Sequence, residues 1–326
     1  MCYNDVSSLN PCKFDRKHIF LLLINLHQIM EINGEENRKA LIYLHTSVLL
    51  AGFCGVFGRL ITMNEVDIVF YRILFTIAIL LIFVGLPRIG WKKFFQIIGC
   101  GALLGLHWIL FYGSIKMSNV SIGVVCYALI GFFTAFIEPV VFHRKIAIRE
   151  ILFSLLTLVG LLLIFSFDTR YRVGIAVGAV ASLVASLFLV FTKKVDEGIS
   201  TRTITLYEMM GGMVGVILSA PVYLWIFPPE TGVLVVPDTQ NLIYLLCLAL
   251  FCTVGQYMFQ FLSLKHLSAF TVNLTYNLEP VYAIIIAFIL FGEGREVNIS
   301  FYVGILFILA SVCMQTRQTM KKNYGE

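Results

Sequence analysis

The sequence predicts an all-α integral membrane protein with ten transmembrane helices, arranged as two inverted repeats of five helices. Three observations predict this fold class: the composition, the spacing of the apolar segments, and a similarity between the two halves of the chain. Of the 326 residues, 59% are hydrophobic and 13% are charged, and the mean hydropathy is +0.89. Soluble globular proteins are roughly half apolar and about a quarter charged. This chain therefore lacks the polar side chains needed to cover a water-facing surface.

Apolar segments of membrane-crossing length recur along the chain. A transmembrane helix needs about 20 mostly apolar residues to cross roughly 30 Å of hydrocarbon. The connections are mostly short, which favours antiparallel neighbours and leaves no room for a soluble domain. The longest connection runs from Pro228 to Gln240 and contains further prolines that prevent helix. The ten predicted spans are residues 41–61, 67–86, 94–115, 119–142, 149–166, 173–192, 203–226, 240–263, 269–291 and 299–316.

The chain divides into four parts. Residues 1–40 are a polar segment expected in the cytoplasm, and 317–326 are a cytoplasmic tail. Residues 41–192 hold six spans, which are the first repeat of five and the first span of the second repeat, and 203–316 hold the remaining spans.

The first 29 residues allow two interpretations. Phe20–Leu26 is too short to span a bilayer, and no convincing cleavage site follows it. Met30 opens the polar stretch that leads into the first span. One interpretation is that translation starts at Met1. The other is that it starts at Met30 and that residues 1–29 are an extension introduced by the gene prediction.

The loop charges predict the orientation. Lys and Arg concentrate in cytoplasmic loops of membrane proteins. On the side that holds the N-terminus the loops carry many cations, including Arg38, Lys92 and Lys193, whereas the other side carries few. We therefore expect a multi-pass protein of the cell (inner) membrane with both termini cytoplasmic. The cations of the other side are Lys116, Arg170, Arg172 and Arg295.

The two halves of the chain resemble each other. Tyr112–Lys116 matches Phe261–Lys265, and at the same offset Tyr127 meets Tyr276 and His107 meets Gln256. At a slightly shorter offset Tyr71-Arg72 meets Tyr207-Glu208, and Val56–Arg59 meets Val190–Lys193. The long connection after residue 228 accounts for most of the change. An odd number of spans in each repeat places the second copy upside down, an arrangement typical of transporters with a site near the midplane.

Small residues recur at the spacing of one helical turn. Such residues let helix backbones approach closely inside a membrane. We expect close helix packing at four pairs, which are Gly101 and Gly105, Gly174 and Gly178, Ala181 and Ala185, and Gly211 and Gly215.

Two segments carry a resemblance to a known family. The late fourth span, 128–139, reads ALIGFFTAFIEP and runs into a basic loop, and the ninth span reads NLEPVYA from Asn277 and ends Phe291-Gly292-Glu293. With the Tyr71-Arg72 pair, these segments resemble the EamA-type members of the drug/metabolite transporter superfamily over about residues 40–316. Gly131 stands where that family usually has proline, and His143-Arg144-Lys145 replaces its Gly-Glu-Arg exit.

The resemblance implies a ten-span transporter of a small organic metabolite that works by alternating access, in the exporting direction. An amino-acid-like molecule or similar amphiphile fits the candidate site best. Proton coupling is implied loosely, and the substrate and oligomeric state are left open. The alternatives are a flippase or carrier of a lipid-linked sugar, and a membrane scaffold without transport activity.

Ionisable side chains inside spans are costly and are therefore candidate functional groups. Arg72, in the second span, could bind a carboxylate or phosphate with two parallel hydrogen bonds, or it could brace neighbouring helices. Glu208 is its counterpart of opposite charge in the seventh span. Glu279 precedes Pro280 in the ninth span, where it could exchange protons or bind an amine, or remain a neutral hydrogen-bonded group.

Polar and aromatic side chains are predicted at the depth of these charges. Asn273, Tyr276 and Asn277 share one face of the ninth span. Such a polar stripe should face the bundle interior, so the set outlines an amphipathic, aromatic-rich cavity; each member alone could simply bond helix to helix. The other members of the predicted substrate site are His107, Trp108, Tyr127, Gln256 and Tyr257.

Several function classes are not indicated. The net charge of +5 is spread over short loops, which does not favour nucleic-acid binding. The eight cysteines contain no CxxC pair, and the histidines show no metal-ligand spacing, so no metal is predicted. The chain has no GxSxG, HExxH or P-loop pattern. We expect no enzyme activity and no cofactor; the predicted partners are a small-molecule substrate and the lipid bilayer.

Overall fold

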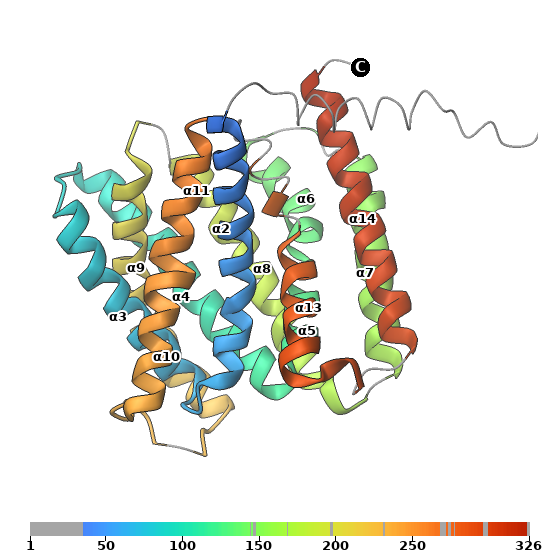
Figure 1. Ribbon diagram of the computed structural model, residues 1–326, viewed down its shortest axis with the longest axis horizontal. Coiled ribbons are helices and arrows are strands. Elements are labelled where there is room, and N and C mark those ends of the chain that lie inside the picture. The colour runs from blue at the N-terminus through green and yellow to red at the C-terminus, as the bar shows by residue number, and fades with distance from the viewer. Residues whose placement is uncertain are drawn as a thin grey trace, which may run out of the picture.

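The computed structural model describes residues 35–143, 145, 148–167, 169–195, 198–230, 232–267, 272, 275, 276, 278–295 and 299–324. Over these residues the regular structure is entirely helical (Figure 1). The helices of the first half are α2 (Glu35–Leu60), α3 (Glu65–Val84), α4 (Trp91–Met117), α5 (Val120–Tyr127), α6 (Ile130–Val141) and α7 (Ile148–Phe167). Those of the second half are α8 (Arg172–Val195), α9 (Thr201–Ile226), α10 (Thr239–Ala249), α11 (Gln256–Leu264), α13 (Glu279–Phe291) and α14 (Ile299–Tyr324). Short helices are η1 (Thr169–Tyr171), η2 (Leu250–Gly255, a π-helix) and η3 (Glu293–Arg295).

The helices form a bundle whose members run up and down. The start of α2 and the end of α14 lie at the same end of this bundle (Figure 1). We call this end the terminal face and the other end the opposite face. Polar side chains begin several helices: Asn64, Asn119, Ser200 and Asp238 each accept a hydrogen bond from a backbone N–H in the first turn.

The structure places membrane-crossing helices where the sequence predicts spans. Within the described residues, seven helical segments are long and apolar enough to cross a bilayer, three of them made by α2, α3 and α4 and a fourth by α5 with α6. The rest of the seven are α8, α9, and α10 continued through η2 into α11. The remaining predicted spans coincide with α7, α13 and α14. The number of ten spans and their division into two inverted repeats stay predictions.

Glycines hold α4 and α9 in backbone contact. A Cβ on Gly101 would collide with the Glu208 carbonyl oxygen, and a Cβ on Gly211 would collide with that of Ile98. Gly105 meets Gly212 and Gly215 meets Ala102 in the same way. Gly174 and Gly178 bring α8 against Ser114, Ser118 and Cys126. The predicted close packing at these glycine pairs is confirmed.

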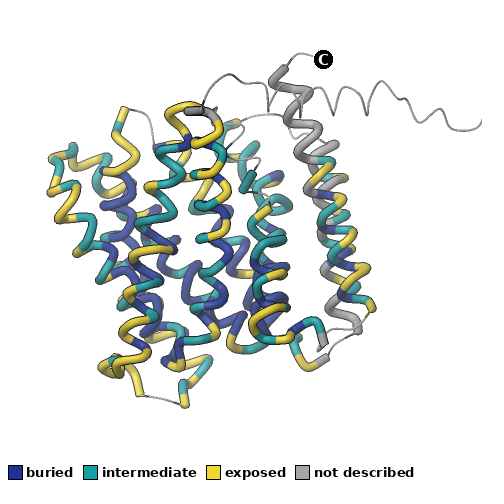
Figure 2. Tube along the Cα trace, viewed as in Figure 1, coloured by how far each residue is buried: buried dark blue, intermediate teal, exposed yellow. Residues whose placement is uncertain are grey.

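The opposite face is the better packed end of the bundle. Figure 2 shows the buried residues concentrated toward this end of the inner helices. Every residue of α5 from Val120 to Cys126 is buried, whereas α6, which continues toward the terminal face, buries only Ala135. The same contrast holds in the eighth span, where α10 buries four residues and α11 buries only Ser263.

Asp67 fastens the long connection between α9 and α10 to the opposite face. Its fully buried carboxylate accepts hydrogen bonds from the backbone N–H groups of Leu234 (2.8 Å) and Val235 (3.2 Å). Asn64 adds a bond to the carbonyl oxygen of Gly232 (3.0 Å). This proline-rich loop is thereby attached to the first turn of α3.

Candidate functional site

A cavity lies in the middle of the bundle, where several spans depart from regular α-helix. The fourth span breaks between Tyr127 and Ile130, the eighth passes through the π-helix η2, and α13 begins at Glu279. Interrupted helices at this depth are typical of transporter sites, and π-helical turns occur often at functional sites. The cavity has a volume of about 170 Å³. Its lining is Ala51, Cys54, Arg72, Leu104, His107, Trp108, Phe111, Val124, Tyr127, Ala185, Phe188, Leu189, Gln256, Tyr257 and Glu279.

Arg72 is the positive charge of this cavity, and only neutral groups hold it. Its Nε donates to the Thr253 hydroxyl (3.0 Å), and Nη1 donates to the Tyr112 hydroxyl (2.8 Å). Nη2 approaches the Cys54 sulfur (3.7 Å), and the guanidinium stacks 3.8 Å from the ring of Trp108. An arginine has five N–H donors, so these contacts leave two, one on each terminal nitrogen. No carboxylate among the described residues pairs with this buried cation.

His107 and its neighbours form an aromatic wall. The Nδ1 atom of His107 lies 2.9 Å from the carbonyl oxygen of Ala181, which can only accept, so Nδ1 carries the proton and donates. The ring of His107 packs against the rings of Phe111 and Tyr127, with centroids 6.0 and 5.6 Å away. In the neutral tautomer this leaves Nε2 as a hydrogen-bond acceptor.

Gln256 and Tyr276 belong to one hydrogen-bond network. The Gln256 side-chain amide donates to the Tyr276 hydroxyl (3.3 Å), and the Ser47 hydroxyl donates to the backbone carbonyl oxygen of Gln256 (2.8 Å). Tyr276 does not line the cavity but stands behind Gln256, which does. The network ties α2 to α11 beside the cavity.

Glu279 brings a carboxyl group into the same cavity. Within the described part of the chain it has no hydrogen-bond or ion-pair partner. The sequence predicts Glu279 near the middle of the ninth span, directly before Pro280. The structure instead starts α13 at Glu279, because a proline fits the first turn of a helix, where its missing N–H costs nothing. The helix start therefore delivers the carboxyl group to the cavity.

Seven of the predicted site residues line the cavity together: Arg72, His107, Trp108, Tyr127, Gln256, Tyr257 and Glu279. Glu208 does not, because its carboxylate accepts from the Thr192 hydroxyl (2.7 Å) where α8, α9 and α4 pack. Arg72 and Glu208 form no ion pair. Asn273 and Asn277 lie outside the described residues.

Sequence reasoning missed several groups at the site. Thr253 bonds Arg72 from within η2, and no sequence signal distinguishes a π-helical turn from the α-helix around it. Cys54 is hidden in an apolar run, although its helical spacing from Ala51 and Ser47 places it on the inner face. Phe111 and Phe188 look like ordinary apolar residues of a span.

Comparison with known proteins assigns the chain to a family. The sequence profile of the EamA-like transporter family matches twice, over residues 38–166 and 172–317. The protein belongs to the EamA-like transporter family. The predicted resemblance to this family is confirmed, and membership makes the chain a multi-pass membrane transporter, a kind of protein that is generally not an enzyme.

A related sequence and a solved structure are similar to this EamA-like protein. A protein of Clostridium kluyveri named "Uncharacterized transporter" is 22% identical over 238 residues, which are 69% of this chain and 72% of that protein. A crystal structure with 14% sequence identity aligns with a TM-score of 0.57 over 88% of this chain and 99% of its own. At this identity the structural similarity supports the fold alone.

Proposed function

We propose that the protein transports a small zwitterionic metabolite of the amino-acid type through its central cavity. The observation that carries this proposal is that Arg72 and Glu279 line one cavity without being paired with each other or, among the described residues, with any other charged group. An unpaired cation and an unpaired ionisable acid in a membrane interior are costly. A zwitterionic solute would satisfy both at once.

The cavity offers a distinct partner to each part of such a solute. The two N–H groups left on Arg72 match a carboxylate, which an arginine binds through parallel hydrogen bonds. The Glu279 carboxylate would accept from the amine. The aromatic rings of Trp108, Phe111 and Tyr127 provide an apolar wall for the side chain of the solute.

The volume of the cavity favours a small solute. Sites for drug-sized ligands are about 300–1,000 Å³, and this cavity is smaller. That size argues against a lipid-linked sugar as the substrate. A scaffold without transport activity would have no use for an arginine and a glutamate left unpaired in one cavity.

We propose alternating access by ten spans in two inverted repeats. The double match of the family profile, with its boundary between α7 and α8, supports two copies of one unit. The cavity lies between the two copies, as expected for repeats that rock about a central site.

We propose that the protein exports its substrate across the cell (inner) membrane and that both termini are cytoplasmic. The cation-rich loops lie at the terminal face, which positive-inside charge bias assigns to the cytoplasm. The tight packing of α5 closes the opposite face, so in this state the cavity would load from the cytoplasm. Glu279, as the unpaired acid of the cavity, is our candidate for coupling to protons.

Counterflow in proteoliposomes tests the proposal. Vesicles preloaded with one unlabelled solute are given a trace of the labelled form, using L-amino acids, the corresponding amines, the corresponding carboxylic acids, sugars and nucleosides. We expect saturable exchange of one or more amino acids, with amines and acids that lack one charge exchanging far less. Exchange of sugars or nucleosides alone, or no exchange by folded protein, would refute the substrate class; lipid flipping would then be the next assay.

A further inference from the structure

A buried glutamate at the opposite face joins three helices that are far apart in sequence. Glu293, directly after α13, is fully buried and forms an ion pair with Arg59 at the end of α2. The same carboxylate accepts from the backbone N–H groups of Val120 (3.0 Å) and Ser121 (2.9 Å), and from the Ser121 hydroxyl (2.6 Å). The end of the ninth span is therefore fastened to the start of the fourth.

This carboxylate completes the N-terminus of α5. The first free N–H groups of a helix need acceptors, and a negative charge there is favoured by the helix dipole. Asn119 accepts from the N–H of Ile122 (2.9 Å), and Glu293 takes those of Val120 and Ser121. A side chain from the second half of the chain thus caps a helix of the first half.

The terminal face carries a similar cluster, in which the cation and the phenylalanine are repeat-related to those of the opposite face. Lys193, which the repeat relates to Arg59, forms an ion pair with Glu138 (2.7 Å). Arg59 lies 4.5 Å from the ring of Phe291, and Lys193 lies 5.6 Å from the ring of Phe142. Phe142 and Phe291 are related by the same offset as Tyr127 and Tyr276.

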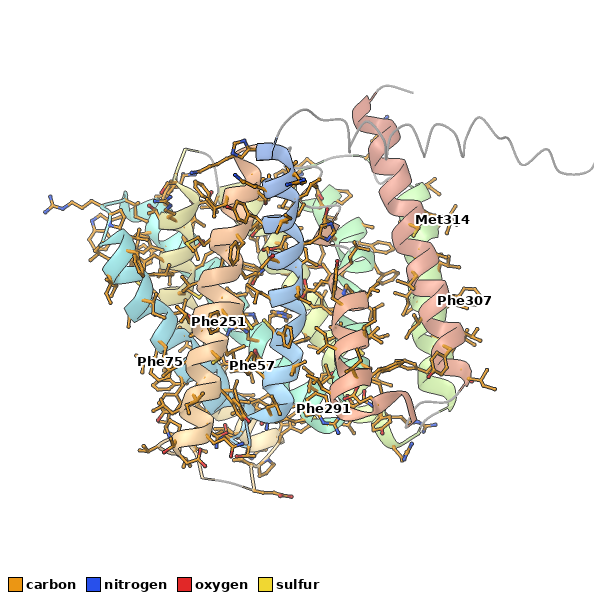
Figure 3. All side chains as sticks on the ribbon, viewed as in Figure 1. Phe57, Phe75, Phe251, Phe291, Phe307 and Met314 are labelled. Atoms are coloured by element: carbon orange, nitrogen blue, oxygen red, sulfur yellow. The ribbon has the colours of Figure 1, made fainter. Side chains whose placement is uncertain are left out.

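Figure 3 shows Phe291 toward the opposite face of the bundle. The acids are not related by the repeat offset, because Glu138 lies within α6, four residues before Phe142, whereas Glu293 lies two residues after Phe291, beyond the end of α13.

The two clusters differ in how far their charged side chains are buried. At the opposite face, the side chain of Glu293 is 0% exposed and that of Arg59 is 35% exposed. At the terminal face, Glu138 is 29% and Lys193 59% exposed. In the part of the chain that the structure describes, the Glu138 carboxylate binds Lys193 alone and caps no helix. Only the cluster at the opposite face crosses from the ninth span to the fourth.

We infer that the cluster at the opposite face is a latch that holds this face of the cavity closed. This opposite-face latch, made by Arg59, Phe291 and Glu293 with the start of α5, is shut in this structure. The terminal-face cluster of Lys193, Phe142 and Glu138 keeps its ion pair too, but it is more exposed and caps no helix in the described part of the chain. This inference rests on the alternating access of the proposed function, and it assigns Glu293 as the group whose contacts with α5 must break before the cavity opens to the opposite face.

The latch is tested by labelling Cys54, a cavity residue, from either face. The protein carries Cys54 as its sole cysteine, sits in vesicles of known orientation, and meets a charged methanethiosulfonate reagent that cannot cross the bilayer. In the parent protein we expect Cys54 to react mainly from the terminal face. Glu293→Gln is expected to raise the rate from the opposite face at least about tenfold, a change of about 1.4 kcal/mol, which is close to the lower end of the range for a hydrogen bond to a charged group.

Two further variants make the result specific. Ser121→Ala removes one donor to Glu293 and should shift the labelling in the same direction by a smaller factor; it carries the test if Glu293→Gln does not fold. Glu138→Gln, the matched change at the terminal face, should leave the opposite-face rate at or below that of the parent.

Unchanged opposite-face labelling in both Glu293→Gln and Ser121→Ala would overturn the latch, as would an equal rise at both faces. The labelling needs no solute. A shift in labelling by a protein that fails every counterflow assay would therefore uphold the latch while refuting the proposed substrate.

Discussion

Replacing Gly101 by alanine tests the contact between α4 and α9. The new Cβ would lie 2.8 Å from the Cα and the carbonyl carbon of Glu208, and closer still to its oxygen. These are backbone atoms of a helix and cannot rotate away. Gly99, one half-turn earlier on the same helix, has no atom within 4 Å of its ideal Cβ position. Gly99→Ala is therefore the matched control.

The expected magnitudes follow from these two environments. Forcing a methyl group into a close-packed contact costs about 1–3 kcal/mol. Alanine is favoured over glycine in a helix by about 0.8–1.0 kcal/mol, and this gain applies at both positions, so it cancels when the two variants are compared. The two variants should therefore differ by about 1–3 kcal/mol in the free energy of unfolding, with Gly101→Ala the less stable.

Unfolding of the purified protein in mixed micelles, by titration with sodium dodecyl sulfate, measures this difference. The midpoint should fall for Gly101→Ala and should be equal to or higher than that of the parent for Gly99→Ala. Gly211→Ala, which meets the Ile98 backbone across the same contact, should behave like Gly101→Ala. Equal stability of Gly101→Ala and Gly99→Ala would refute the backbone contact between α4 and α9.

Three other predictions concern the site and the loop. Arg72→Lys keeps the charge but loses the planar donor fork, so counterflow of the best substrate should show at least a tenfold loss of kcat/KM, about 1.4 kcal/mol or more; activity equal to the parent would exclude a two-point grip on the carboxylate. Glu279→Gln should abolish any dependence of net flux on a pH gradient while the protein still folds, and a gradient response like that of the parent would exclude Glu279 as the coupling group. Asp67→Ala should lower the unfolding free energy by at least about 1.5–3 kcal/mol, the range for a hydrogen bond to a charged group, and should speed protease cleavage within residues 228–238; Asp238→Ala, which removes only a helix cap, is the milder comparison, and unchanged cleavage would show that Asp67 does not fasten the loop.

Composition and apolar spacing predict the membrane class and the helix positions because lipid allows few alternatives. A spanning segment must satisfy its own backbone, and helices do so locally. The same local rule placed Arg72, Trp108 and Glu279 near one depth, and the structure brings them to one cavity. Depth along a helix can be counted from the sequence alone.

Rotation about the helix axis and departures from α-helix are harder to predict. Glu208 has the same depth argument as Arg72, yet it turns toward Thr192 because the glycines of α4 and α9 fix which face of α9 meets α4. The π-helix that presents Thr253 depends on its neighbours rather than on its own residues. The role of Glu293 cannot be predicted from its own span, because it depends on a contact with the start of α5, a distant part of the chain.

Proximity in sequence favours pairing of Glu138 with Arg144 or Lys145. The structure pairs Glu138 with Lys193 and not with Lys145, and Arg144 lies outside the described residues. A lysine on an adjacent helix competes with near neighbours in sequence whenever the two helices pack together, as α6 and α8 do. Such pairings depend on the tertiary fold.

Fluorescence of Trp108 tests most directly that the central cavity is the transport site. The chain has three tryptophans, and Trp91 and Trp225 are 76% and 82% exposed, so both can be replaced by phenylalanine with little cost. The protein that retains Trp108 alone is then titrated with the amino acid that exchanges best in counterflow. We predict a saturable change in emission that Arg72→Ala abolishes. Saturable exchange without any change in Trp108 emission would contradict the account, because the solute would then cross by a route that avoids this cavity.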